Sequence, residues 1–255
     1  MSWHNKVVWT EGMFLQPQHF QQHDRFLANQ MQAKVASMSP YHWGFADLQI
    51  DEAALAMGKL ALVSARGVLP DGTAFSMPIE DAVPAALDIG ADVRNEVVVL
   101  AVALPRPGVV ETDAEEAGGS TPPRLHAAGV EVADSNATAD RTAEVLIGRL
   151  NARLMLARDA GEGHACLGAV RVIERRADNR LVLDNQYVPP MLHARASLVL
   201  DGYVRELVGL LHQRGEALGA RLAQPGRAGV GEIADFLLLE TVNRNEPVFA
   251  HLQNV

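Results

Sequence analysis

The chain has 255 residues, of which 48% are hydrophobic and 21% are charged, and its formal net charge is -9. This composition excludes a disordered tail and predicts one large domain or two modest ones, each with its own core. The acidic balance argues against nucleic acid and anionic membrane surfaces as partners, because binding to phosphates needs clustered cations.

The first 40 residues lead into one predicted amphipathic helix. Pro17 stands where a helix can begin, because the missing N–H of a proline costs nothing in the first turn. Apolar side chains then recur at helical spacing, at Phe20, Leu27, Met31, Val35 and Met38. We expect the helix to end at Ser39, since the residue before Pro40 is pushed out of the helical region.

Between residues 41 and 190 the pattern changes to short strands separated by turns. Alternation from Lys59 to Ala65 leads to Asp71-Gly72, which indicates a hairpin because both residue types tolerate positive φ. The β-branched run from Asn95 to Pro105 predicts a strand that is buried on both faces. Further candidate strands are Val130 to Val132, Ala143 to Leu156, His164 to Ile173 and Leu181 to Leu183. The sequence therefore predicts an antiparallel β-sandwich.

Two parts of this region have other features. The leucines between Ala143 and Leu156 also fit a helix, so that stretch stays open between strand and helix. Residues 105–129 are rich in proline, glycine and acidic residues, and we expect them to form a long exposed loop.

Beyond Pro190 the apolar residues fall three or four apart again, which predicts helices. A long helix with a leucine stripe should run from about Leu192 to a break near Gln224-Pro225-Gly226, with Arg214 interrupting the stripe. A second helix should start near Glu232, and Asn245-Glu246-Pro247 has the composition of a cap and first turn of a third. Because the sequence stops a few residues later, we expect it to be a fragment. The stripe fits a local helical hairpin and a bundle between subunits equally well.

Residue types that carry chemistry do not form a convincing constellation. His19 and His23 have the spacing of a zinc pair, but no third ligand is predictable and structural roles are favoured. The acidic pairs Asp51-Glu52, Glu80-Asp81 and Glu115-Glu116 lie at turns or in the acidic segment, where solvated charge is expected. The single cysteine, Cys166, has apolar neighbours and is interpreted as a buried structural residue. We therefore predict no enzyme activity, no cofactor and no metal site.

Two further signals concern location. The longest apolar run, Val97 to Leu104, is far shorter than the ~20 residues that span a bilayer. The first residues also lack the basic-then-apolar layout of a signal peptide. A cytoplasmic protein without direct membrane insertion is expected.

The segment WTEGMFLQPQHFQQHDR, from Trp9 to Arg25, carries a resemblance to a known family. It is similar to the opening signature of the TssK (ImpJ/VasE) family of bacterial type VI secretion systems, W-x-E-G-M-F-L-x-P-Q-H-F-Q-Q-x-D-R. Gln16 departs from the arginine that is usual there. Other stretches that resemble the family, in the same order, are Gly58 to Pro78, Leu181 to Leu192, Glu206 to Arg214 and Ile233 to Pro247. Residues 105–129 do not align.

The resemblance implies an architecture and a set of partners. TssK-like proteins are homotrimers with a β-sandwich shoulder, a helical neck and a C-terminal head. The shoulder attaches to the TssF–TssG baseplate wedge, chiefly through TssG, and the head attaches to the membrane complex of TssJ, TssL and TssM. The expected fold is thus α+β, with residues 1–40 as an N-terminal segment and helix, 41–190 as the shoulder and 191–255 as a partial neck. The head would be missing, and the protein would dock at the inner-membrane complex during assembly.

Two functions remain open at this point: a structural adaptor that works by protein contacts alone, and a ligand-binding module, for instance for a glycan, in the manner of phage receptor-binding proteins. The adaptor is favoured, because Trp3, Trp9 and Trp43 all lie near the N-terminus and none lies in a variable loop. Candidate interface or packing residues are Trp9, Phe14, Leu15, Phe20, Leu27, Met31, Leu207 and Leu210. We predict that the Phe20, Leu27 and Met31 face packs on Leu207 or Leu210 of the same or a neighbouring subunit.

Overall fold

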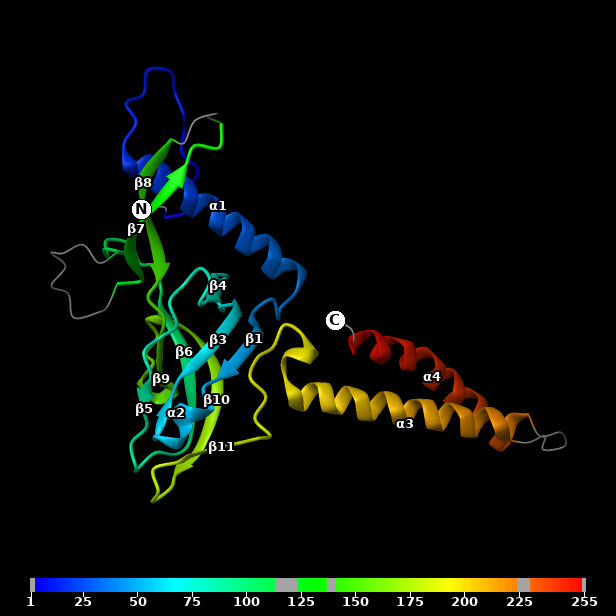
Figure 1. Cartoon of the computed structure of the whole chain (residues 1–255). Helices are drawn as coiled ribbons and strands as arrows, with labels where there is room; N and C mark the ends of the chain where they lie inside the picture. The colour runs from blue at the N-terminus through cyan, green and yellow to red at the C-terminus, as the bar shows by residue number, and fades with distance from the viewer. Residues whose placement is uncertain (1–2, 113–122, 137–140, 224–229, 254–255) are drawn as a thin grey trace.

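The computed structural model describes residues 3–112, 123–136, 141–223 and 230–253. Along the chain, helix α1 (Pro17–Met38) is followed by a body of two β-sheets and then by a helical hairpin that projects from it (Figure 1). The bounds of α1 are the predicted ones. Pro17 lies in its first turn, and Ser39 at its C-cap has extended backbone, as expected of a residue before proline.

The body is built from antiparallel strand pairs. Its strands are β1 (Gly44–Ile50), β2 (Lys59–Leu60), β3 (Leu62–Val68), β4 (Ala74–Met77), β5 (Leu87–Asp88), β6 (Arg94–Ala103), β7 (Leu125–Ala133), β8 (Thr142–Leu150), β9 (Arg153–Leu156), β10 (His164–Arg175) and β11 (Leu181–Leu183). A three-stranded sheet has the order β1-β3-β4 and a four-stranded sheet the order β11-β10-β6-β9. Two ribbons, β2-β5 and β7-β8, and the short helix α2 (Glu52–Ala56) complete it. The predicted α+β fold with an antiparallel sandwich is confirmed.

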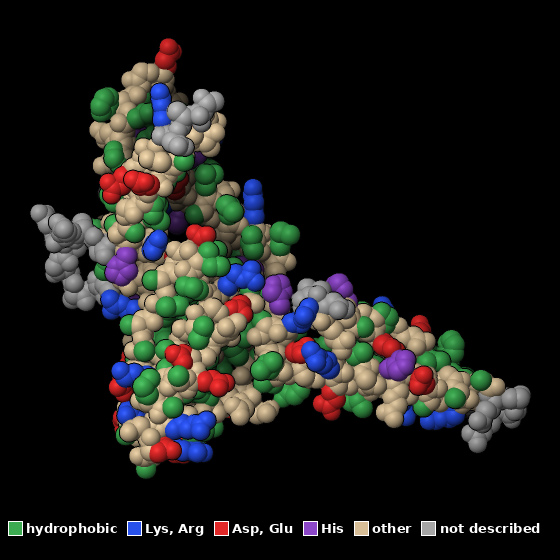
Figure 2. All heavy atoms as spheres, in the orientation of Figure 1, with side chains coloured by type: hydrophobic (Ala, Val, Ile, Leu, Met, Phe, Trp, Pro, Cys, Tyr) green, Lys and Arg blue, Asp and Glu red, His purple; other side chains and the backbone are tan. Residues whose placement is uncertain are grey.

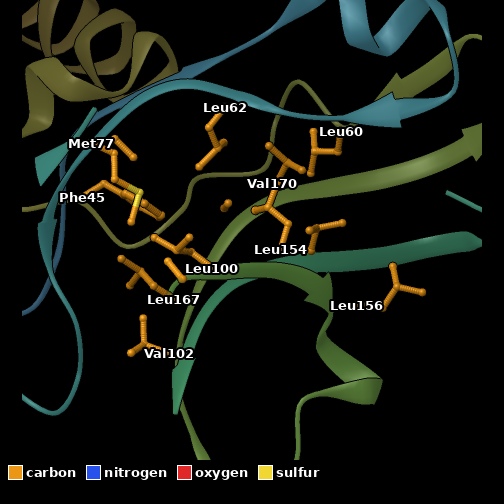
Figure 3. Packing of buried hydrophobic residues seen from close by; sticks show 14 of the residues in the cluster. Phe45, Leu60, Leu62, Met77, Leu100, Val102, Leu154, Leu156, Leu167 and Val170 are labelled. Atoms are coloured by element: carbon orange, nitrogen blue, oxygen red, sulfur yellow. The ribbon is translucent and has the colours of Figure 1, made fainter. Parts of the chain in front are cut away.

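The core lies between the two larger sheets. In Figure 3, Phe45 and Met77 from one sheet lie toward Leu100 and Leu167 from the other. Phe45 packs edge-on against Phe75, with ring centroids 5.9 Å apart. The five consecutive residues Val98 to Val102 in β6 are all buried, which confirms the strand that was predicted to be covered on both faces.

The hairpin predicted at Asp71-Gly72 joins β3 to β4, but its loop is longer than a two-residue turn. The Leu69 N–H donates to the Thr73 carbonyl at 2.9 Å, which closes a five-residue loop. Gly72 has φ of +84°, and a Cβ there would collide with the side chain of Gln32 on α1. Glycine is therefore favoured by the backbone conformation, and a larger residue would also have to displace the end of the Gln32 side chain.

The β7-β8 ribbon corrects one expectation and settles an open alternative. Residues 125–129, expected in an exposed loop, form the first half of β7, while 113–122 lie outside the described residues. The stretch from Ala143 to Leu156 is not helical; it belongs to β8 and β9, separated by Asn151 and Ala152. The ribbon pairs over nine residues in each strand, and this pairing decides for the strand where the leucine spacing also fitted a helix.

Polar contacts fix the ribbon to the sandwich at the start of β7 and at the end of β8. Arg124 forms an ion pair with Asp71, with a 3.0 Å separation, and also donates to Thr73 Oγ1 and the Ala103 carbonyl. At the end of β8, the Leu150 N–H donates to Asp81 Oδ1 at 2.9 Å. These bonds hold the ribbon in a defined direction relative to the sandwich.

The chain leaves the sandwich beside β1. The Phe45 N–H donates to the Pro190 carbonyl at 2.8 Å, and the Leu192 N–H donates to the Phe45 carbonyl at 2.8 Å. Helix α3 (Leu198–Leu222) begins later than predicted, because Ser197 caps it by accepting from the Leu200 N–H. Leu192 therefore precedes the helix, and the predicted break at 224–226 lies outside the described residues.

We call the hairpin of α3 and α4 (Val230–Leu252) the neck. Its second helix, α4, is a single helix that continues through Pro247. The third helix expected at Asn245-Glu246-Pro247 is therefore wrong. The two neck helices pack on each other where Leu218 and Val242 are buried and Gly215 lies close to Val242. The local hairpin is thus present, and Figure 1 shows it extending away from the sandwich.

Candidate protein interface

The N-terminal segment folds back onto the first turns of α1. Gln22 Nε2 donates to the carbonyls of Trp3 at 3.3 Å and Asn5 at 2.7 Å. The guanidinium of Arg25 lies 4.3 Å from the centre of the Trp3 ring and donates to Gln22 Oε1 at 3.0 Å. The cation–π contact and the hydrogen bonds together hold Trp3 and Asn5 against α1.

The two histidines of the signature have structural roles. Gln16 caps α1, and its backbone N–H donates to His19 Nδ1 at 3.0 Å, which completes a reciprocal capping box. Trp9 packs against both imidazoles, with ring centroids 6.3 Å from His19 and 6.0 Å from His23. Within the described ranges, no cluster of three or more histidine, cysteine or acidic side chains could hold a metal ion.

Helix α1 presents its mainly polar side to the rest of the chain. Its half-buried positions are His19, Gln22, His23, Arg25, Phe26, Asn29 and Gln32. Gln32 reaches His42, with 3.1 Å between their side-chain nitrogens, and so fixes the far end of the helix. An amphipathic helix ordinarily buries its apolar stripe. In α1 the orientation is the opposite, and none of its residues is buried.

The apolar stripe of α1 consists of Phe20, Leu27, Met31, Val35 and Met38, which are between 43% and 85% exposed. The predicted contact of this face with α3 of the same chain is not present, because Leu210 is itself 56% exposed and Leu207 is only half-buried. Figure 1 shows α1 and α3 pointing in different directions from the sandwich. The contact with a neighbouring subunit stays a prediction.

The signature also holds two apolar side chains at the surface. A turn closed by the Met13 N–H and the Thr10 carbonyl, at 3.3 Å, contains Gly12 with φ of +76°. Phe14 and Leu15 follow this turn and are both exposed, Phe14 at 83%. Trp9 is also 45% exposed, but one side of its ring packs on Phe20 and the histidines. All four candidate residues of the signature, Trp9, Phe14, Leu15 and Phe20, thus keep an exposed apolar surface.

The neck hairpin leaves further apolar surface open. Large side chains of α3 and α4 that remain exposed are Leu198, Tyr203, Leu210, Ile233, Phe236, Leu237, Leu238, Val248 and Leu252. In Figure 2, hydrophobic side chains reach the surface along α1 and along the neck. Exposed apolar patches of this extent mark protein contact sites in soluble proteins.

Two of the acidic residues considered for catalysis, Asp51 and Asp81, instead accept hydrogen bonds from backbone N–H groups. Asp51 caps α2 by accepting from the Ala53 N–H at 2.9 Å. Asp81 was expected to be solvated but is buried, because it accepts backbone N–H groups from Leu150 and Ser76. Glu115 and Glu116 lie outside the described residues. Sequence reasoning missed Asp81 and Arg124, since only the fold brings each to a distant backbone segment.

Cys166 is half-buried rather than buried, and burial raises the pKa of its thiol. A raised thiol pKa lowers the fraction of thiolate, which is the nucleophilic form. One open cavity of about 380 Å³, lined by Phe75, Arg66 and Asp81 among others, holds a carboxylate that is already bonded to backbone groups. These features do not suggest a nucleophile or an acid–base pair.

The helices in the described part of the chain include none long and apolar enough to cross a membrane. The exposed apolar stripe of α1 is interrupted by Asp24, and the neck carries charges along its length.

The chain is similar to proteins of bacterial type VI secretion systems. A family profile described as bacterial type VI secretion, with the members EvfL, ImpJ and VasE, matches residues 19–255. The type VI secretion system baseplate component TssK1 of Pseudomonas aeruginosa is 47% identical over 257 residues, covering 100% of this chain and 57% of the relative. The chain thus spans a little over half the length of this relative.

Solved structures agree in fold. A crystal structure of TssK superposes with a TM-score of 0.88 at 39% identity, over 99% of this chain and 57% of that one. TssK in the TssK-TssF-TssG baseplate subcomplex gives a TM-score of 0.83 at 24% identity, over 98% of this chain and 81% of that one. The 24% likeness concerns the fold alone. The family match, the identity over the whole chain and the shared fold show that this chain belongs to the TssK family of bacterial type VI secretion proteins.

Proposed function

We propose that the protein is a structural component of the type VI secretion baseplate in the bacterial cytoplasm, a homotrimeric adaptor that works by protein contacts without catalysis or cofactor. The observation that carries the proposal is the inverted orientation of α1. Its polar side is bonded to its own chain through Gln22 and Gln32, while its apolar stripe faces solvent. Exposing such a stripe is unfavourable by roughly 25 cal/mol for each Å² of apolar surface that a partner could cover.

Similarity supports the identity of the partners. TssK, with which this chain shares its fold, is part of a solved baseplate subcomplex with TssF and TssG. We infer that the sandwich of this chain is the shoulder that attaches to the TssF–TssG wedge. The relative TssK1 is considerably longer than this chain. A C-terminal head beyond these residues would attach to the TssJ, TssL and TssM membrane complex and so dock the protein at the inner membrane.

The neck and α1 are the proposed surfaces between subunits. Leu210 and the exposed side chains of α4 need a cover that the hairpin does not provide. Packing the Phe20, Leu27 and Met31 face of one subunit on Leu207 or Leu210 of its neighbour would supply one. The variants Leu27→Glu and Leu207→Glu should then lower both the molecular mass in solution and the melting temperature. An unchanged mass and melting temperature in both variants would refute this contact.

Co-purification separates the adaptor from a glycan-binding module. The tagged chain, co-expressed with TssF and TssG of the same secretion system, should retain both after washing in moderate salt. Val63→Glu, at an exposed strand position of the sandwich, is a matched variant for mapping the contact. Binding to a glycan array without any complex with TssF or TssG would overturn the proposal.

A further inference from the structure

The apolar stripes of α1 and α3 are each interrupted by one charged residue of opposite sign. On α1 it is Asp24, between Phe20 and Leu27; on α3 it is Arg214, one turn after Leu210. Asp24 and Arg214 are both exposed, and neither side chain has an ion pair or hydrogen bond in the described part of the chain. The other ion pairs of α3, such as Arg205 with Asp201, are formed within the neck.

The apolar positions on one side of these charges have matching spacing when the two helices run antiparallel. From Asp24, Met31 follows after seven residues and Val35 after eleven. From Arg214, counted backwards, Leu207 comes after seven residues and Tyr203 after eleven. At 1.5 Å per residue both stripes therefore extend about 16 Å from the charge. Placing Asp24 beside Arg214 brings Met31 to Leu207 and Val35 to Tyr203.

A second pair of charges favours the same direction. Lys34 lies ten residues after Asp24, and Glu206 lies eight residues before Arg214, so in the antiparallel register they are about 3 Å apart along the axis. Lys34 and Glu206 are also exposed. In a parallel register with Asp24 beside Arg214, Lys34 would lie beyond Leu222, where α3 ends. Charge complementarity therefore selects the antiparallel arrangement.

We propose that α1 of one copy packs antiparallel on α3 of a second copy, with Asp24 paired to Arg214 and Lys34 paired to Glu206. This inference rests on the proposed homotrimer and names the residues that set the register of its subunits. The occupant of the α1 stripe is a second copy because the complementary stripe is on this same chain, where Tyr203 and Leu210 are exposed and Leu207 is half-buried. In a cyclic trimer each subunit would offer one α1 and one α3, so the contact would be made three times.

Charge reversal and its rescue test the register. Sedimentation equilibrium of the 255-residue chain should show that Asp24→Arg and Arg214→Asp each weaken self-association by about tenfold or more, because like charges would face each other. The double variant D24R/R214D should return to within about threefold of the unaltered chain, since the pair is restored with reversed polarity. Glu162→Arg reverses an exposed carboxylate in the loop before β10 and should leave association unchanged.

The outcomes separate this inference from the proposed function. If the unaltered chain is trimeric but neither single reversal weakens it, or if the double variant is as weak as the sum of the two, the register is wrong and the adaptor stands. If the unaltered chain is monomeric at all concentrations, the inferred contact falls together with the homotrimer. Circular dichroism of each variant checks that the fold is intact, which is expected because both side chains are on the surface.

Discussion

Arg124 links the β7-β8 ribbon to the sandwich through several partners. Its guanidinium and the Asp71 carboxylate are only 11% and 15% exposed, and it also bonds Thr73 and the Ala103 carbonyl. Removing one partner of such a pair leaves the other charge buried and unpaired.

We expect Arg124→Ala to lower the free energy of unfolding by about 2–4 kcal/mol, since breaking a buried pair typically costs ~3–5 kcal/mol and this one is slightly hydrated. Urea denaturation would measure it. Arg205→Ala removes an exposed pair within α3 and should cost less than about 1 kcal/mol. Equal effects of the two substitutions would contradict the assigned role of Arg124.

His212 gives the neck a pH dependence. Its Nδ1 lies 2.9 Å from Glu246 on α4 and its Nε2 lies 3.6 Å from Glu216. The hydrogen bond to Glu246, followed by the charge of Glu216, raises the pKa of His212 above its ordinary value of 6.5. A raised folded-state pKa means that this stabilisation is fully present below pH 6.5 and is lost as pH rises through the folded pKa.

The stability that His212 adds to the neck should decline as pH rises above 6.5 in the unaltered chain. The variant His212→Gln should not show this decline. NMR titration of the His212 ring would show a midpoint above 6.5, and Glu246→Gln would lower that midpoint. A midpoint at or below 6.5 in the unaltered chain would contradict the contact.

At the scale of elements, Pro247 is a residue type that disfavours the helix in which it lies. It lies inside α4, where a proline removes one backbone hydrogen bond and crowds the preceding turn. The side chain of Asn245 donates to the Thr241 carbonyl at 2.7 Å, one turn away. Pro247→Ala should restore the lost bond and raise the free energy of unfolding by about 1–3 kcal/mol in thermal or urea unfolding. A decrease would mean that the proline shapes a contact that the helix needs.

The sequence was sufficient where one local cause decides an element. Pro17 and the Ser39-Pro40 step bound α1, and the β-branched run of β6 predicted a strand buried on both faces. It failed where distant partners decide. Residues 125–129 have the composition of a loop and become a strand only by pairing with β8. Pro247 has the local signature of a helix start, but it lies inside α4, whose apolar spacing continues through it. The sequence also could not predict which side of α1 faces the chain, because this orientation depends on the contacts of Gln22 with Trp3 and of Gln32 with His42.

At the scale of the whole molecule, the chain is a sandwich from which three largely uncovered elements project: α1, the β7-β8 ribbon and the neck (Figure 1). The sandwich has a closed core, whereas the apolar stripe of α1 and part of the apolar surface of the neck are exposed (Figure 2). Such a division is expected of a subunit whose folding is completed by assembly.

Light scattering on the purified chain after size-exclusion chromatography tests the proposed assembly most directly. We expect a mass of about three times the 27.5 kDa of one chain, which rises further when TssF and TssG are added. A mass of one chain, unchanged by concentration and by the two wedge proteins, would contradict the trimeric adaptor.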